Sequence, residues 1–191
     1  MKTITLLLAL LISFNSFADD LEDAMNAYIN GDYKTAFGIY QELAEQGDAI
    51  AQFTLGWMYH KGKGIHTSNR HAAFQWYTKA AEQGQVDAQF QLGDFYYNGD
   101  VNLQDFKQSF HWYTKAAEQG HVDAIQSIGY MYIDGKGVKK NYVKAHMYLN
   151  IASAKGRQRA KTNRDIVAKE MTPEQIAEAQ KLAREWMKKH Q

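Results

Sequence analysis

An internal repeat of about 36 residues constrains the fold of this chain more than any other feature of its sequence. A segment rich in alanine and aromatic residues recurs four times and ends each time in glycine, at Gly47, Gly84, Gly120 and Gly156. The spacings between these glycines are 37, 36 and 36 residues. A fixed period of about 20–50 residues is typical of solenoids, in which each unit buries its apolar surface by stacking on its neighbours.

Two segments alternate within each repeat, and both have helical spacing. The first begins at Ala51, Ala88 and Ala124 and has the pattern Ala-x-x-x-Leu-Gly-x-x-Tyr, with isoleucine for leucine in the last copy. The second contains Trp-Tyr-x-x-Ala-Ala-x-x-Gly in its two best-matched copies. Because apolar residues recur at intervals of three and four, each segment presents one apolar helix face. We therefore predict an all-α solenoid of about four helix pairs, near 21–47, 48–84, 85–120 and 121–156.

Glycine occupies two distinct positions in this pattern. The four terminal glycines stand where a helix ends, and glycine takes the left-handed conformation of a helix C-terminus without steric penalty. Gly56, Gly93 and Gly129 instead lie inside the first helix of a pair, where glycine costs about 1 kcal/mol relative to alanine. Recurrence of this cost at one repeat position predicts that a neighbouring helix approaches the backbone closely there.

This combination of motifs resembles the Sel1-like repeat, a relative of the tetratricopeptide repeat. The resemblance includes a glycine pair between the two helices and covers about residues 21–156. The pairs are Gly62 with Gly64 and Gly135 with Gly137, whereas the middle copy departs from the pattern with Gly99-Asp100-Val101. Their recurrence favours structural turns over phosphate-binding loops. The resemblance implies a right-handed α/α superhelix.

The resemblance also implies where a partner would bind. In arrays of this type the first helix of each pair lines the concave side, so binding side chains are expected there. The expected partner-binding residues are Phe53, Trp57, His60, Phe90, Asp94, Tyr97, Tyr130, Ile133 and Asp134. Large aromatic side chains are frequent anchors of protein partners. Packing of individual rings against the next repeat is the alternative, and it is favoured for Phe53 and Phe90.

The function implied by the resemblance is that of an exported scaffold or adaptor. Such a protein would bind a protein or peptide partner in the cell envelope or in contact with a host. A glycan- or peptidoglycan-binding module, which would use the exposed tryptophan and tyrosine rings, is the alternative. The repeat spacing by itself predicts only the scaffold.

Motifs of catalysis are not found in the sequence, and we expect neither an enzyme nor a cofactor. There is no Gly-x-Ser-x-Gly elbow, no Walker phosphate loop and no His-Glu-x-x-His pair. Some exported members of the family have been discussed as binding β-lactams, but the Ser-x-x-Lys pattern of that chemistry is absent. His60, His66 and His71 lie near one linker, where solvent-exposed loop histidines are favoured over a weak metal site.

Residues 1–18 have the pattern of a secretory signal. Lys2 is followed by the apolar run 6–12, and Ser16-Phe17-Ala18 places small residues at the positions that a signal peptidase recognises. Cleavage is expected after Ala18, which predicts a periplasmic or secreted protein. A membrane anchor is the alternative, although seven apolar residues are far fewer than the roughly 20 that span a bilayer. The chain has no cysteine, so its stability must come from packing.

Charge divides the remaining chain into two parts. Residues 19–154 carry a net charge of −5 and residues 155–191 carry +5. The resulting neutral balance argues against a nucleic-acid-binding protein. Residues 157–191 are expected to form a basic capping helix pair, in which Thr172 caps a helix with Gln175 three residues on and Pro173 in the first turn. Docking of this segment on an acidic partner or anionic lipid is the alternative.

Overall fold

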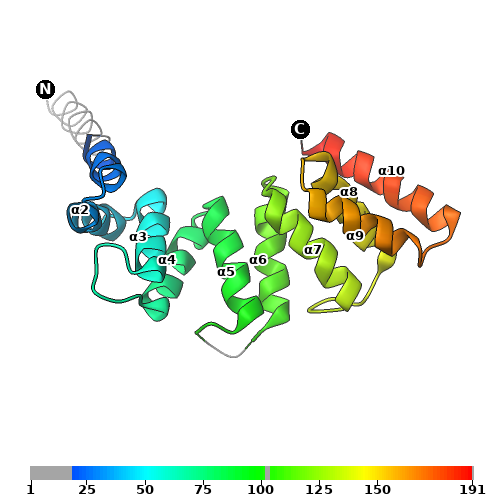
Figure 1. The fold of residues 1–191 in the computed structure, drawn as a ribbon, viewed down its shortest axis with the longest axis horizontal. Coiled ribbons are helices and arrows are strands. Elements are labelled where there is room, and N and C mark those ends of the chain that lie inside the picture. The colour runs from blue at the N-terminus through cyan, green and yellow to red at the C-terminus, as the bar shows by residue number, and fades with distance from the viewer. Residues whose placement is uncertain (1–18, 102–103, 191) are drawn as a thin grey trace, which may run out of the picture. The chain divides into compact units, whose positions relative to one another are not determined.

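The computed structural model describes residues 19–101 and 104–190, and all regular secondary structure in this part of the chain is α-helical (Figure 1). A helical segment over 19–29 precedes helices whose bounds are α2 (Tyr33–Glu45), α3 (Ala49–Lys61), α4 (Arg70–Glu82), α5 (Val86–Asn98), α6 (Phe106–Glu118), α7 (Val122–Asp134), α8 (Tyr142–Ala154), α9 (Gln158–Ala168) and α10 (Pro173–Lys189). The prediction of an all-α chain of consecutive helix pairs is confirmed. The signal segment 1–18 lies outside the described residues.

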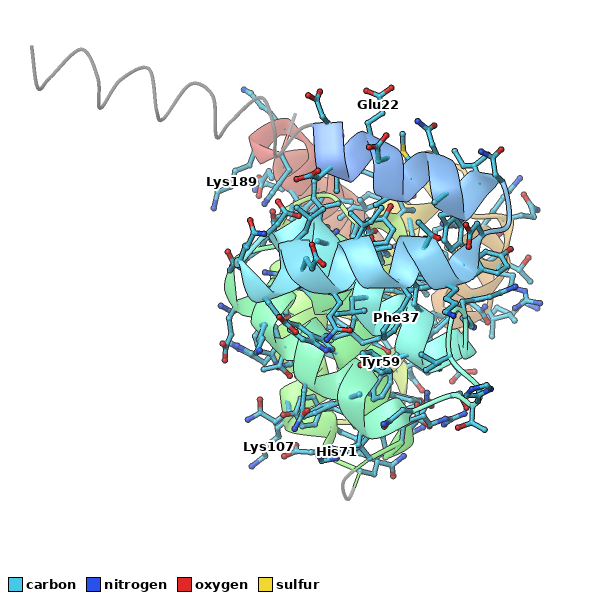
Figure 2. All side chains as sticks on the ribbon, turned by 90° about the vertical axis from the view of Figure 1, so that its left-hand side faces the viewer. Glu22, Phe37, Tyr59, His71, Lys107 and Lys189 are labelled. Carbon is cyan, nitrogen blue, oxygen red and sulfur yellow. The ribbon has the colours of Figure 1, made fainter. Side chains whose placement is uncertain are left out.

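Two compact units make up the chain, the first ending at Gln85 and the second beginning at Val86. In the first unit, α3 packs against both α2 and α4. Its core contains Leu43, Leu55 and Met58, each at most 1% exposed. At its edge, Phe37 of α2 and Tyr59 of α3 meet edge to face with their ring centroids 5.2 Å apart (Figure 2). Both rings are packed against the buried core of this unit.

In the second unit, each helix packs against the next from α5 to α9, and α10 returns to pack on α8. Leu149 and Ile151 of α8 are fully buried at its centre, together with Ile128 of α7. Ala179 and Ala183 of α10 are also fully buried, because small side chains allow the two helices to approach closely. Helix α10 thus covers the last apolar face of this unit.

Helix ends follow the sequence signals. The side chains of Asp48, Asn69 and Asn141 each accept a hydrogen bond from the backbone N–H three residues on, which satisfies one free donor at the start of the helix. At the other end, the four terminal glycines of the repeat have φ between 88° and 102°. Helix α10 begins with the predicted capping box, in which Thr172 and Gln175 bond reciprocally. These features stop each helix where the repeat requires a turn.

The glycines inside the first helices sit against the second helix of the same pair, as predicted. A Cβ atom added at any of the three would lie 2.5–2.9 Å from a side chain across the interface, which is closer than real Cβ atoms approach. The opposing residues are Gly56 with Tyr77, Gly93 with Tyr113, and Gly129 with Leu149. The missing side chain therefore lets a large residue of the second helix lie directly on the first.

The glycine pairs between helices have structural roles. Gly62 and Gly135 are left-handed caps that end α3 and α7. Gly137 lies against the backbone carbonyl of Phe106 at the start of α6, so that a Cβ atom would clash there. Gly64 lies in the same way against the carbonyl of Tyr33. These glycines thus place each loop directly on the preceding helix pair.

Candidate binding site on helices α5, α6 and α7

A hollow of about 290 Å³ opens among three consecutive helices of the second unit. We call it the α5–α7 pocket; its lining residues are Asp94, Tyr97 and Asn98 of α5, Tyr113 of α6, and Ser127 and Tyr130 of α7. One carboxylate, several hydroxyl groups and three tyrosine rings therefore face a common space. Figure 1 shows the three helices running side by side.

The close approach of α6 to α5 creates the polar centre of this pocket. Because Gly93 has no side chain, the Tyr113 ring lies against the α5 backbone, and a Cβ atom there would be 2.5 Å from Cδ1 of the ring. This placement brings the Tyr113 hydroxyl to the next residue, Asp94. The hydroxyl donates a hydrogen bond to Asp94 Oδ1 over 2.5 Å.

Burial raises the pKa of both Asp94 and Tyr113. Burial is the main cause that raises the pKa of Asp94 to about 6, and the carboxylates of Asp100 and Asp123 raise it further, while the Tyr113 hydrogen bond opposes the shift. Burial, followed by the neighbouring Asp94, raises the pKa of Tyr113 well above its usual range. At pH 7 the pocket thus holds a neutral phenol and a largely ionised, poorly hydrated carboxylate.

Neighbouring side chains hold the two outer tyrosines of the pocket in place. Lys136 Nζ donates a hydrogen bond to the Tyr97 hydroxyl over 2.7 Å and lies 4.8 Å from the centroid of that ring. Asn163 of α9 donates to the Tyr130 hydroxyl over 3.1 Å. Both rings are therefore fixed before any ligand arrives, which lowers the entropic cost of binding.

Three other predicted residues of the second unit lie outside the pocket lining. Phe90 stacks on His121 with ring centroids 4.4 Å apart and also contacts Tyr113, so it packs between helices. Ile133 packs against the hydrophobic core. Asp134 is exposed and forms an ion pair with Lys136 at 3.5 Å.

The predicted residues of the first unit contact neighbouring rings of that unit. Phe53 and His60 both approach Tyr77, with centroid distances of 5.8 and 6.4 Å. Trp57 meets Tyr28 edge to face at 5.8 Å and packs against the core. Within this unit the three half-buried side chains take part in helix packing, and their role in binding a partner stays a prediction.

Sequence reasoning missed Asn98, Tyr113 and Ser127. Tyr113 belongs to the second-helix motif, whose tyrosine has the spacing of a core residue. The available signal was a contrast between repeats, because Asp94 stands where the neighbouring copies have Trp57 and Tyr130. A carboxylate at a repeat position that is aromatic in the other copies indicates that a polar group lies nearby in the fold.

Neither a metal-binding cluster nor a membrane-spanning helix is found in the described part of the chain. Within 19–101 and 104–190, no group of three histidine or acidic side chains is placed to hold a metal ion, and His60, His66 and His71 form no such cluster. None of the helices in the same ranges is long and apolar enough to cross a membrane.

Comparison with known families follows the helix pairs closely. The Sel1 repeat model matches residues 27–48, 49–85, 86–121 and 122–156. The chain belongs to the Sel1-repeat family. The α5–α7 pocket lies in the last two Sel1 repeats, between the first helices of both and the second helix of the earlier one. No curated protein matches the sequence.

Solved Sel1-repeat structures share this fold. The chain is 35% identical to c5321, a protective antigen of uropathogenic Escherichia coli with an SLR fold, over 82% of this chain and 33% of that one, with a TM-score of 0.74. A Sel1 repeat protein from Oxalobacter formigenes is 39% identical over 66% of this chain and 52% of that one, with a TM-score of 0.63. Helicobacter pylori cysteine rich protein B is 27% identical over 69% and 93% of the two chains, with a TM-score of 0.54. This chain therefore spans about a third of the first relative and half of the second.

Proposed function

We propose that this chain is an exported Sel1-repeat scaffold that binds a protein or peptide segment, with the α5–α7 pocket as a point of contact. The observation that carries the proposal is the half-buried carboxylate of Asp94, which lies among tyrosine rings in an open hollow. Convergent polar groups with a perturbed pKa in a partly apolar pocket are typical of binding sites. The first helices of the repeats supply most of the lining, as in related repeat arrays.

Export and an extracytoplasmic role rest on different observations. Residues 1–18 have the pattern of a cleavable signal. The similar protein c5321 is described as a protective antigen, which is compatible with a role for this chain in the cell envelope or at a host contact. The acidic repeat region and basic C-terminal segment offer surfaces of opposite charge to such partners.

Photo-crosslinking in living cells tests the proposal directly. A photoreactive amino acid replaces Asn98, which lines the α5–α7 pocket, and in a matched variant replaces Glu178, which is exposed on α10. We expect a discrete protein adduct from position 98 that position 178 does not give, and we expect Asp94→Asn to reduce it. Absence of an adduct at position 98, or identical adducts from both positions, would contradict a binding role for the pocket.

A glycan-binding module is the second candidate. The observation in its favour is the fixed orientation of the Tyr97 and Tyr130 rings, since sugars commonly stack on aromatic faces held in this way. Co-sedimentation with isolated cell-wall sacculi separates the two candidates. Retention that depends on Tyr130, combined with no protein adduct from position 98, would favour the glycan.

A further inference from the structure

We infer that the α5–α7 pocket receives the cationic side chain of a lysine or arginine from the bound peptide, with Asp94 as its counter-ion. This inference rests on the proposed function and specifies the chemistry of the residue that the pocket selects.

The charge of the pocket is negative. Asp94 uses Oδ1 to accept from Tyr113, and a carboxylate can accept several further hydrogen bonds. Asp100, after the end of α5, and Asp123 of α7 act on it with the same sign, although Arg157 pairs with Asp123 at 2.6 Å. Lys136 donates a hydrogen bond to the Tyr97 hydroxyl, and its charge is paired with Asp134 at 3.5 Å. A cation therefore enters a favourable field, whereas an anion would be repelled.

The tyrosine rings of the pocket also favour a cationic ligand. The faces of aromatic rings attract cations through the ring quadrupole. Lys136 Nζ lies 4.8 Å from the centroid of the Tyr97 ring and donates to its hydroxyl, so this ring already interacts with one ammonium group. An apolar side chain in the pocket would remove water from the Asp94 carboxylate without offering a hydrogen bond, which is unfavourable. The combination of carboxylate and rings therefore selects a cation over a neutral group.

The pocket has room for one long side chain. Its volume of about 290 Å³ is at the lower end of the roughly 300–1,000 Å³ that is usual for sites of drug-sized ligands. It therefore suits the end of a single lysine or arginine, while the rest of the peptide would lie along the first helices.

The repeat itself shows that Asp94 is not required for the fold. The equivalent positions hold Trp57 and Tyr130, and the residues equivalent to Tyr113 are Tyr77 and Leu149. Helix pairs of the same length form in all three cases. The Asp94–Tyr113 pair is thus a local feature of one repeat, as expected for a determinant of specificity.

Titration of the whole protein with small probes tests the inference without a known partner. The probes are Nα-acetyl-lysine N-methylamide, the corresponding arginine compound and the norleucine compound, which has a similar chain length but no charge. We expect the first two to shift the backbone NMR signals of Asn98 and Ser127 saturably at millimolar concentration, at pH 7.5. Equal shifts with norleucine, or no shift with lysine or arginine, would overturn the inference.

Removal of the Asp94 carboxylate tests its role as the counter-ion, with removal of an exposed carboxylate elsewhere as the control. Asp94→Asn keeps an oxygen that accepts from Tyr113, and we expect it to weaken lysine binding at least about tenfold. Glu178→Gln removes one exposed carboxylate from α10 and should leave binding unchanged. Unchanged binding by a folded Asp94→Asn variant would count against Asp94 as the counter-ion. If that variant does not fold, the affinity of the wild type decides, because it should fall about tenfold from pH 7.5 to pH 5 as Asp94 is protonated.

Selection from a displayed peptide library distinguishes this inference from the proposed function. Enrichment of peptides with lysine or arginine, lost with Asp94→Asn, would support both. Enriched peptides that lack basic residues and bind the variant equally would overturn the inference alone. If the library yields no binder, the proposed function fails, while the probe titration still decides whether the pocket takes a cation.

Discussion

At the scale of single residues, the lack of a side chain at Gly93 determines where the Tyr113 hydroxyl lies. Gly93 is the residue on which the Tyr113 ring rests, and this contact sets the position of the Tyr113 hydroxyl beside Asp94. Packing and pocket chemistry are therefore coupled through one backbone position. Substitutions here are expected to affect stability and the pocket together.

Substitution of Gly93 by alanine should lower the free energy of unfolding by about 1–3 kcal/mol, because the new Cβ atom overlaps the Tyr113 ring. The higher helix propensity of alanine offsets only part of this loss. Gly38→Ala in α2 is the matched control, since a Cβ atom there meets nothing within 4 Å, and it should be stabilising by up to about 1 kcal/mol. Urea denaturation measures the free energy of unfolding of both variants. Equal effects of the two substitutions would show that the contact between Gly93 and the Tyr113 ring is unimportant.

Asp94→Asn should make the protein more stable at pH 7. The folded-state pKa of about 6 exceeds the value of 3.8 in the unfolded chain, so the folded state binds more protons between about pH 4 and 6 and loses stability as the pH rises through that range. The neutral amide removes this loss, and we expect a gain of about 1 kcal/mol at pH 7 that disappears near pH 4. Thermal unfolding at both pH values checks this, and a lower stability at pH 7 would contradict it.

At the scale of elements, α8 carries a histidine where the equivalent helices carry phenylalanine. His146 is 3% exposed and corresponds to Phe74 and Phe110. Burial lowers its pKa, Arg164 of α9 lowers it further, and Asp165 opposes the shift. Among the described residues its Nδ1 atom has no hydrogen-bond partner. Protonation of this ring is therefore unfavourable in the folded protein.

This histidine should make the second unit sensitive to acid. Since its folded-state pKa lies below the unfolded value of 6.5, the unfolded chain takes up the proton first, and stability falls as the pH drops below about 6.5. His146→Phe should raise stability at pH 5 more than at pH 8. Unfolding curves at the two pH values test this, with His66→Phe, in an exposed loop, as the comparison. Equal effects of His146→Phe at both pH values would contradict it.

At the scale of the whole molecule, the sequence predicted the architecture more completely than the lining of the α5–α7 pocket. The repeat spacing and the positions of the glycines indicate helix pairs, because the stacking of similar units requires the same pattern in each repeat. Asp94, Tyr97 and Tyr130 were identified from their repeat positions. Tyr113 and Ser127 were not, since their approach to Asp94 depends on how α6 and α7 pack against α5. Phe90 lies on His121 for the same reason.

Removal of residues 172–191 should destabilise the second unit selectively. Helix α10 packs on α8 through Ala179 and Ala183, and a solenoid without its terminal cover exposes an apolar face. We expect amide hydrogen exchange to increase in α8 and α9 of the shortened chain, with α3 little changed. Uniform exchange rates, or unaltered protection of α8, would show that α10 is not needed as a cover.

In α3, α5 and α7, the interior glycine is followed by a position at which the side chain differs from repeat to repeat. Tryptophan, aspartate and tyrosine all occur after it, at Trp57, Asp94 and Tyr130, on backbones of the same length. If these positions contact a partner as proposed, exchange of the three side chains would change what these repeats bind while the stacking glycine stays in place. Recognition along such an array would then be programmable one repeat at a time.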